Sequence, residues 1–197
     1  GVDKAVLFCT APHPEKAGTL SELEAEMAAL NKILAGSNTK EDNISRLKKN
    51  IAEEYGIGEF TPGSEQQIMQ LETIFRALKN TRIYPVWVHT FQPVTVSGIK
   101  CLMSLCEKYP GIPVIFGHLG GSNWMDVIKF AKEHDDVYLD LSAAFASIAT
   151  KMALTELPER CLYSSDAPYG EPYLYRQLIE FVSPDKRTAE VVLGENI

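Results

Sequence analysis

Short apolar runs alternate with longer amphipathic stretches along most of the chain. Six short runs have the composition of buried strands: "KAVLFCTA" (4–11), "YGIGEF" (55–60), "IYPVWVH" (83–89), "IPVIFGH" (112–118), "VYLDLSA" (137–143) and "CLYSSD" (161–166). Between them, apolar residues recur every three or four positions, which predicts helices over 19–36, 63–80, 96–111 and 123–136, then one ending near Leu154 and one over 173–182. Ser64 and Gln67 are typical of a helix N-terminus. Residues 37–50 are polar and fit either a solvated helix or a junction.

Strands buried on both faces and separated by helices predict parallel β/α units. Two folds share this pattern, a doubly wound open sheet and a β/α barrel. No G-x-G-x-x-G motif opens a helix, so the dinucleotide signal typical of the first fold is missing. We expect a single domain over 1–197 that is incomplete at both ends, because the chain starts in a turn-like segment without methionine and stops at "LGENI".

Composition narrows the classes of function. The chain has 197 residues, 45% of them hydrophobic and 23% charged, with a net charge of −7, which is typical of a globular protein. Scattered lysines and arginines and an acidic balance argue against nucleic acid and anionic membranes as partners. No apolar stretch approaches the roughly 18–20 residues of a membrane span. Four cysteines lack a C-x-x-C pattern and fit reduced thiols of a cytoplasmic protein.

Polar residues stand at the ends of four predicted strands. Glu59, His89, His118 and Asp166 follow one another at intervals of 30, 29 and 48 residues, and the last interval spans two β/α units. In a closed barrel, the carboxyl ends of the strands converge on one mouth. Two histidines and two carboxylates there match the ligand chemistry of Zn²⁺ or a similar divalent ion. A lone strand-end histidine is more often structural, so the regular spacing of the pair carries this prediction.

Other residues have weaker signals. Phe91 and Tyr169 follow strand ends and are predicted to line a substrate site, whereas Trp87 is expected to pack inside the barrel. His13, between two prolines, either faces the same mouth as a substrate contact or is a loop residue. The expected role of Asp140 is helix capping. Gly120 and Gly121 either let a ligand approach the backbone or form the turn into the next helix.

Several of these stretches together resemble a known family. "PVWVH", "PVIFGHLGG", "VYLDLSA", "CLYSSDAPYG" and "VLGENI" are similar to the amidohydrolase-related branch of the metal-dependent hydrolases, which includes aminocarboxymuconate-semialdehyde decarboxylase. The resemblance covers roughly residues 1–35 and 55–197. It implies an α/β fold, a (β/α)8 TIM-like barrel. The family's first strand carries an H-x-H pair that is not found here, and its third strand is not readable in residues 37–54. The chain is therefore expected to lack the family's first strand, and absence of the third is the second expectation.

The resemblance also implies roles for individual residues. His89 would be a metal ligand, His118 would act as a base on a metal-bound water, and Asp166 would bind metal and shuttle a proton. Glu59 stands where some members of the superfamily carry a further ligand. The expected cofactor is a divalent metal ion, with Zn²⁺ first and Mn²⁺ second.

These observations predict an enzyme acting on a small molecule. The first expectation is a metal-dependent hydrolase that cleaves a C–N or C–O bond. The first alternative is a metal-dependent decarboxylase of a small unsaturated or aromatic acid. A metal-free lactonase, or a non-catalytic binding or scaffold relative, is the second alternative. A homodimer is the expected form of any assembly.

Overall fold

The computed structural model describes residues 57–79, 85–144, 146–167 and 169–196. The strand predicted over 4–11, the helix predicted over 19–36, the polar stretch 37–50 and His13 lie outside these residues. The predicted alternation of strands and helices is confirmed over the described part. None of the described helices combines the length and apolar character needed to cross a lipid bilayer.

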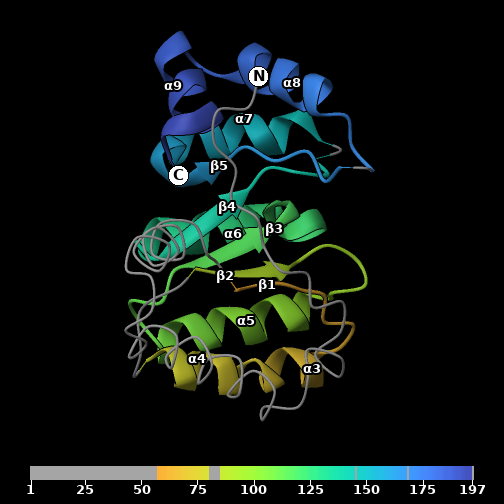
Figure 1. Cartoon of the computed structure of the whole chain (residues 1–197), viewed down its shortest axis with the longest axis vertical. Helices are drawn as coiled ribbons and strands as arrows, with labels where there is room; N and C mark the ends of the chain where they lie inside the picture. Colours follow the sequence, from red (N-terminus) through yellow and green to blue (C-terminus); the bar gives the residue numbers. More distant parts are fainter. Residues whose placement is uncertain (1–56, 80–84, 145, 168, 197) are drawn as a thin grey trace, which may run out of the picture.

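In the described part of the chain, five parallel strands form one sheet, in which neighbours in sequence are neighbours in space (Figure 1). The strands are β1 (Ile57–Phe60), β2 (Val86–His89), β3 (Val114–Gly117), β4 (Val137–Asp140) and β5 (Cys161–Leu162). The register pairs Val88 with Phe116 and His89 with Gly117, so the carboxyl ends of β2 and β3 are level. β5 is shorter than predicted, and Asp166 follows its last residue by four positions rather than closing it.

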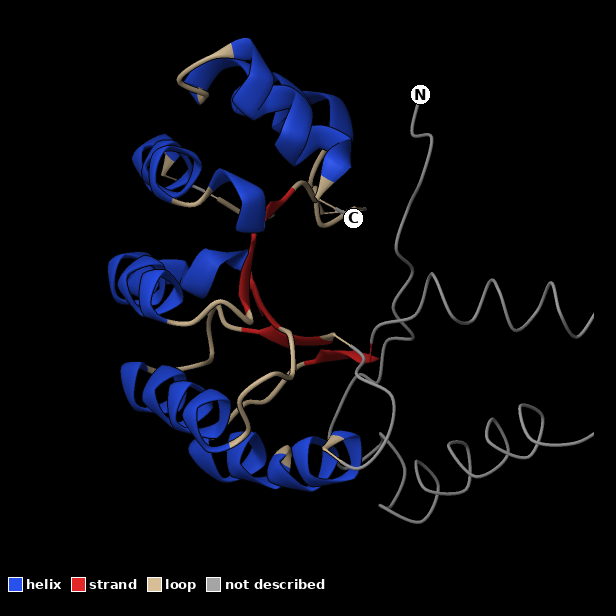
Figure 2. Ribbon diagram, turned by 90° about the vertical axis from the view of Figure 1, so that its left-hand side faces the viewer, coloured by secondary structure: helices blue, strands red, loops and turns tan. Residues whose placement is uncertain are grey.

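The helices lie on one side of this curved sheet (Figure 2). A doubly wound fold would cover both faces, whereas strands in sequential order with helices outside are the arrangement of a β/α barrel wall. The longer helices are α5 (Val96–Lys108), α6 (Trp124–Glu133), α7 (Ser147–Glu156) and α8 (Pro172–Val182). The shorter ones are α3 (Glu65–Gln70), α4 (Glu72–Leu78), α9 (Lys186–Glu190) and the turns η1 (His118–Asn123), η2 (Pro158–Arg160) and η3 (Val191–Glu195).

The single helix predicted over 63–80 is two helices that meet at Leu71. Ser64 caps α3 as predicted, because its hydroxyl accepts a hydrogen bond from the backbone N–H of Gln67. The side-chain oxygen of Gln67, Oε1, accepts a hydrogen bond from the backbone N–H of Gly63 at 2.6 Å. The break at Leu71 lets both helices bury apolar residues, and Ile68, Leu71 and Phe75 are among the most buried side chains.

Side chains along each strand point alternately toward the helices and toward the concave face of the sheet. Val88 and Phe116 belong to the hydrophobic core between sheet and helices, together with helix residues such as Leu102. Successive strand residues point to opposite faces, so Trp87 and His89 lie on the concave face, away from the helices. The fold thereby directs the side chain at the end of β2 toward the inside of the barrel wall.

The chain's last described residue is tied to the last strand. The Asn196 side-chain amide donates to the carbonyl of Pro158 at 2.6 Å and to the carbonyl of Cys161 at 2.8 Å. Asn196 therefore holds η3 against the start of β5.

The three cysteines of the described part, Cys101, Cys106 and Cys161, are free thiols.

A carboxylate joins α4 to the end of α5. One oxygen of Glu72 accepts from Lys108 Nζ at 2.7 Å and from the Tyr109 hydroxyl at 2.8 Å, and Arg76 lies 3.3 Å away. The hydrogen bond from Lys108, followed by that from Tyr109, lowers the pKa of Glu72 from 4.5 to about 2. Glu72 is thus ionised, and its contacts are kept, over the whole neutral and mildly acidic range.

Glu72→Gln should change how stability depends on pH. Because the folded pKa lies below the unfolded one, ionised Glu72 stabilises the fold above about pH 4.5, and this contribution is lost as pH falls toward 2. Urea unfolding should show the wild type as more stable than Glu72→Gln near pH 7. The difference in the free energy of unfolding should shrink as the pH falls from about 4.5 toward 2. Glu107→Gln, at an exposed carboxylate beside Lys108, is the control. A pH-independent difference for Glu72→Gln would contradict the assignment.

Candidate metal centre

Three side chains from successive strands converge at the carboxyl edge of the sheet. Glu59 lies in β1, His89 ends β2, and His118 directly follows β3. Their potential ligand atoms all lie within 4.8 Å of one another. His89 Nδ1 is 3.4 Å from a carboxylate oxygen of Glu59 and 3.0 Å from His118 Nε2. The structure thus brings together three of the four strand-end residues that the sequence singled out.

The ring of His89 is oriented by the backbone that follows it. Its Nε2 lies 3.0 Å from the carbonyl oxygen of Gln92. A carbonyl can only accept, so Nε2 carries the hydrogen and, in the neutral ring, Nδ1 presents a lone pair to Glu59 and His118. Burial opposes the charged form of His89. In that form, however, Nδ1–H can donate to Glu59 while Nε2–H donates to the Gln92 carbonyl, and these contacts raise the pKa of His89.

His118 is enclosed by polar contacts from β4 and the residues after it. Its Nδ1 lies 2.8 Å from the hydroxyl of Ser142, and its backbone N–H donates to Asp140 Oδ1 at 3.1 Å. His118, Asp140 and Ser142 are only 4%, 3% and 1% exposed. Burial lowers the pKa of His118, although the charge of Asp140 opposes the shift.

Asp166 reaches the same region from the residues after β5. It is not one of the three side chains whose ligand atoms cluster, but its charge acts on both His89 and His118. Burial raises the pKa of the Asp166 carboxyl, while the charge of His118 works in the opposite direction. Asp166 therefore lies within electrostatic range of both histidines, and its roles as metal ligand and proton shuttle remain predictions.

Backbone strain is concentrated around this edge. The non-glycine residues with positive φ in the described part are His118 (57°), Leu119 (54°), Ala143 (49°) and Asp166 (58°). All four follow the carboxyl ends of β3, β4 or β5. Such conformations are costly for side-chain-bearing residues and are typical of functional sites.

Aromatic rings pack around His118 on the concave face. The ring of Trp87 lies 5.3 Å from that of His118 and edge-on to it, and the ring of Phe91 lies 6.4 Å away. Trp87 is buried, which confirms its predicted packing role. Phe91 is half-buried beside His118, whereas Tyr169 is 91% exposed. Neither position tests their predicted contact with substrate.

Sequence reasoning missed a buried hydroxyl in this region. Thr90, the residue after His89, donates to the carbonyl of Gly117 and accepts from the N–H of Gly120 at 3.0 Å. It thereby fixes the turn from β3 into η1. Both glycines after His118 form this turn, with φ of 78° at Gly120 and 54° at Gly121. A Cβ at Gly121 would lie 2.4 Å from the ring of Phe91, so this glycine also makes room for Phe91.

Gly117→Ala should disturb the site through packing alone. Its φ is ordinary, at −60°, but an added Cβ would lie 2.2 Å from the ring of Trp87. We expect a loss of about 1–3 kcal/mol in the free energy of unfolding, as for other overpacked positions, measured by urea denaturation. At Gly63, where a Cβ would meet its nearest atom at 3.4 Å, alanine should cost much less. Equal effects of the two substitutions would contradict this account.

Comparison with known proteins identifies the family. A family model described as amidohydrolase matches residues 59–196. The chain therefore belongs to the amidohydrolase family, as the resemblance of its motifs predicted. No curated protein matches the chain.

Solved structures share its fold at low sequence identity. A 2,6-dihydroxybenzoate decarboxylase complexed with 2,6-dihydroxybenzoate is 14% identical, with a TM-score of 0.50 over 77% of this chain and 64% of that one. An uncharacterised TIM-barrel protein from Bordetella bronchiseptica is 16% identical, with a TM-score of 0.64 over 97% and 63%. A dihydroxybenzoic acid decarboxylase from Polaromonas sp. JS666, with bound manganese and the inhibitor 2-nitroresorcinol, is 17% identical, with a TM-score of 0.50 over 77% and 62%.

These matches concern only part of the related proteins. The chain spans less than two thirds of the length of each of the three. The likeness supports an α/β fold with a parallel sheet of the TIM-barrel type. The described strands correspond to a partial barrel, and a complete (β/α)8 barrel remains an expectation.

Proposed function

We propose that this protein is a divalent-metal-dependent decarboxylase of small aromatic carboxylic acids. The observation that carries the proposal is the convergence of Glu59, His89 and His118 at the carboxyl edge of a parallel sheet. The sequence alone favoured hydrolysis over decarboxylation. The order is reversed here because similar solved structures include decarboxylases, one with its aromatic acid and one with manganese.

The residues present fit a divalent cation. A carboxylate and imidazole nitrogens are ligands that suit Zn²⁺ and Mn²⁺. In our proposal Glu59 and His89 hold the ion, with Asp166 as a further ligand from the residues after β5. The hydrogen bond from His89 Nε2 to Gln92 supports this, because metal-binding histidines commonly donate their second nitrogen to a carbonyl. Mn²⁺ gains support from the manganese of the Polaromonas enzyme.

Decarboxylation replaces a carboxylate by a proton at the same carbon. The C–C bond to the carboxylate breaks, CO₂ leaves, and the electron pair left on the ring carbon is taken up by a proton. A bound divalent ion would supply positive charge beside the substrate's oxygen atoms. His118 Nε2 and the Asp166 carboxyl are the groups of this chain that we assign to holding and delivering the proton. The half-buried ring of Phe91, which packs beside His118, gives the concave face an apolar side suited to an aromatic substrate.

Hydrolysis of a C–N bond is the second candidate function. The match to a family described as amidohydrolase favours it. It would use the same proposed ligands, with His118 accepting a proton from water instead of giving one to carbon. A metal-free or non-catalytic role would require that the cluster bind no divalent ion.

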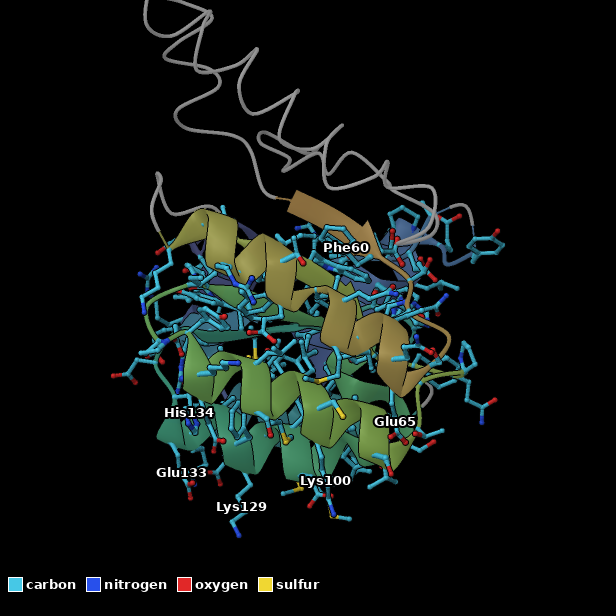
Figure 3. The ribbon with its side chains drawn as sticks, turned by 90° about the horizontal axis from the view of Figure 1, so that it is seen from below. Phe60, Glu65, Lys100, Lys129, Glu133 and His134 are labelled. Atoms are coloured by element: carbon cyan, nitrogen blue, oxygen red, sulfur yellow. The ribbon has the colours of Figure 1, made fainter. Side chains whose placement is uncertain are left out.

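Metal binding is the first test. The full chain, freed of metal and titrated with Mn²⁺ by calorimetry, should bind about one equivalent. His89→Ala should abolish or strongly weaken binding. His134→Ala should leave it unchanged, because His134 directly follows the last residue of α6 and lies across the molecule from Phe60 in β1 (Figure 3). Absence of Mn²⁺ and Zn²⁺ binding in the wild type would overturn the proposal.

Turnover is the second test. The Mn²⁺-loaded chain should release CO₂ from 2,6-dihydroxybenzoate or another hydroxybenzoate, detected by mass spectrometry. His118→Asn should keep the metal and lower the rate at least about 100-fold, the size of a general acid–base contribution. If a panel of anilides and esters is cleaved while no acid loses CO₂, hydrolysis is the function. Full activity of His118→Asn would remove His118 from its assigned role.

A further inference from the structure

A chain of buried hydrogen bonds links His118 to Asp140. The hydroxyl of Ser142 is close enough to donate to Asp140 Oδ1, and an ionised carboxylate can only accept. The same oxygen accepts the backbone N–H groups of Ser142 and His118, each at 3.1 Å. Asp140 thus holds the hydroxyl of Ser142 and the main chain of His118 at once.

The direction of this chain decides which nitrogen of His118 carries hydrogen. The single hydrogen of the Ser142 hydroxyl is used on Asp140, so Ser142 Oγ can only accept from His118 Nδ1 at 2.8 Å. The neutral ring is then the Nδ1–H tautomer, and Nε2 presents a lone pair. Because the hydrogen of His89 is used on Gln92, a second lone pair, on His89 Nδ1, faces the first at 3.0 Å.

Two lone pairs at this distance repel each other unless a positive charge lies near them. With the other tautomer, His118 Nε2–H would donate to His89 Nδ1, and a neutral hydrogen bond would occupy the lone pair that His89 offers to a metal. The orientation of the Ser142 hydroxyl therefore determines whether His89 is available as a ligand and whether His118 can accept a proton at Nε2.

We propose that Ser142 and Asp140 are positioning residues that hold His118 in the Nδ1–H tautomer and thereby keep the lone pair of His89 open for a cation. This inference rests on the proposed metal site for its consequence, but the tautomer is defined without metal. It assigns a role to the "DLS" sequence at the end of β4 that helix capping does not explain.

The tautomer can be read directly by ¹⁵N NMR. Ring nitrogens with and without hydrogen are distinguished by chemical shift, and the His118 signals are assigned by their absence in His118→Asn. In the metal-free full chain at about pH 8, where neutral imidazole dominates, Nδ1 of His118 should carry the hydrogen. Ser142→Ala should move it to Nε2, Ser142→Thr should retain the wild-type tautomer, and Ser147→Ala is the matched control. Hydrogen on Nε2 in the wild type, or an unchanged tautomer in Ser142→Ala, would refute the proposal.

Metal affinity gives the second readout. Ser142→Ala should weaken Mn²⁺ binding about 10- to 100-fold, as is typical when a partner of a site histidine is removed, and Ser142→Thr should restore most of it. If the wild type binds no Mn²⁺, the proposed function fails, while the His118 tautomer in the wild type and in Ser142→Ala still tests the positioning role. If Ser142→Ala changes the tautomer but not the Mn²⁺ affinity, the link to the cation site is wrong. Thermal unfolding checks that each variant is folded.

Discussion

The level pairing of parallel strands is the constraint on which the rest of the structure depends. Hydrogen bonding between β2 and β3 sets His89 opposite Gly117, so His118 follows immediately at the same edge. A shift of the register by one residue would turn Trp87 and His89 toward the helices and separate the two imidazoles. The buried valines and phenylalanine on the helix side of these strands make such a shift costly. The packing of the core thereby specifies the geometry of the site.

Much of this arrangement could be predicted from the sequence because it depends on local patterns. The apolar runs that end in His89 and His118 predicted strands β2 and β3. The interval between the two histidines predicted that their side chains lie at the same edge of the sheet. The break at Leu71 and the short β5 were not predictable, because tertiary packing and strand pairing set element boundaries. The positions of Phe91 and Tyr169 depend on loop conformation, to which no periodicity applies.

The residues that sequence reasoning missed are small and polar. Thr90 and Ser142 come directly after or close behind strand residues, where a hydroxyl is easily interpreted as a turn or cap. Asp140 was interpreted as a cap for the same reason. Their contacts join different strands, and a hydrogen bond between residues 22 or more positions apart leaves no pattern in one sequence. Such buried polar groups must be satisfied together, so each one is understood only from its neighbours in space.

The two outer strands of the described sheet have a practical consequence. Within the described part of the chain, β1 pairs only with β2, and β5 pairs only with β4. An unpaired edge strand presents its backbone N–H and C=O groups to any extended peptide, including a second copy of the same chain. A fragment limited to the described strands would present both of these edges, so self-association through strand pairing is expected of it whatever the strength of its core.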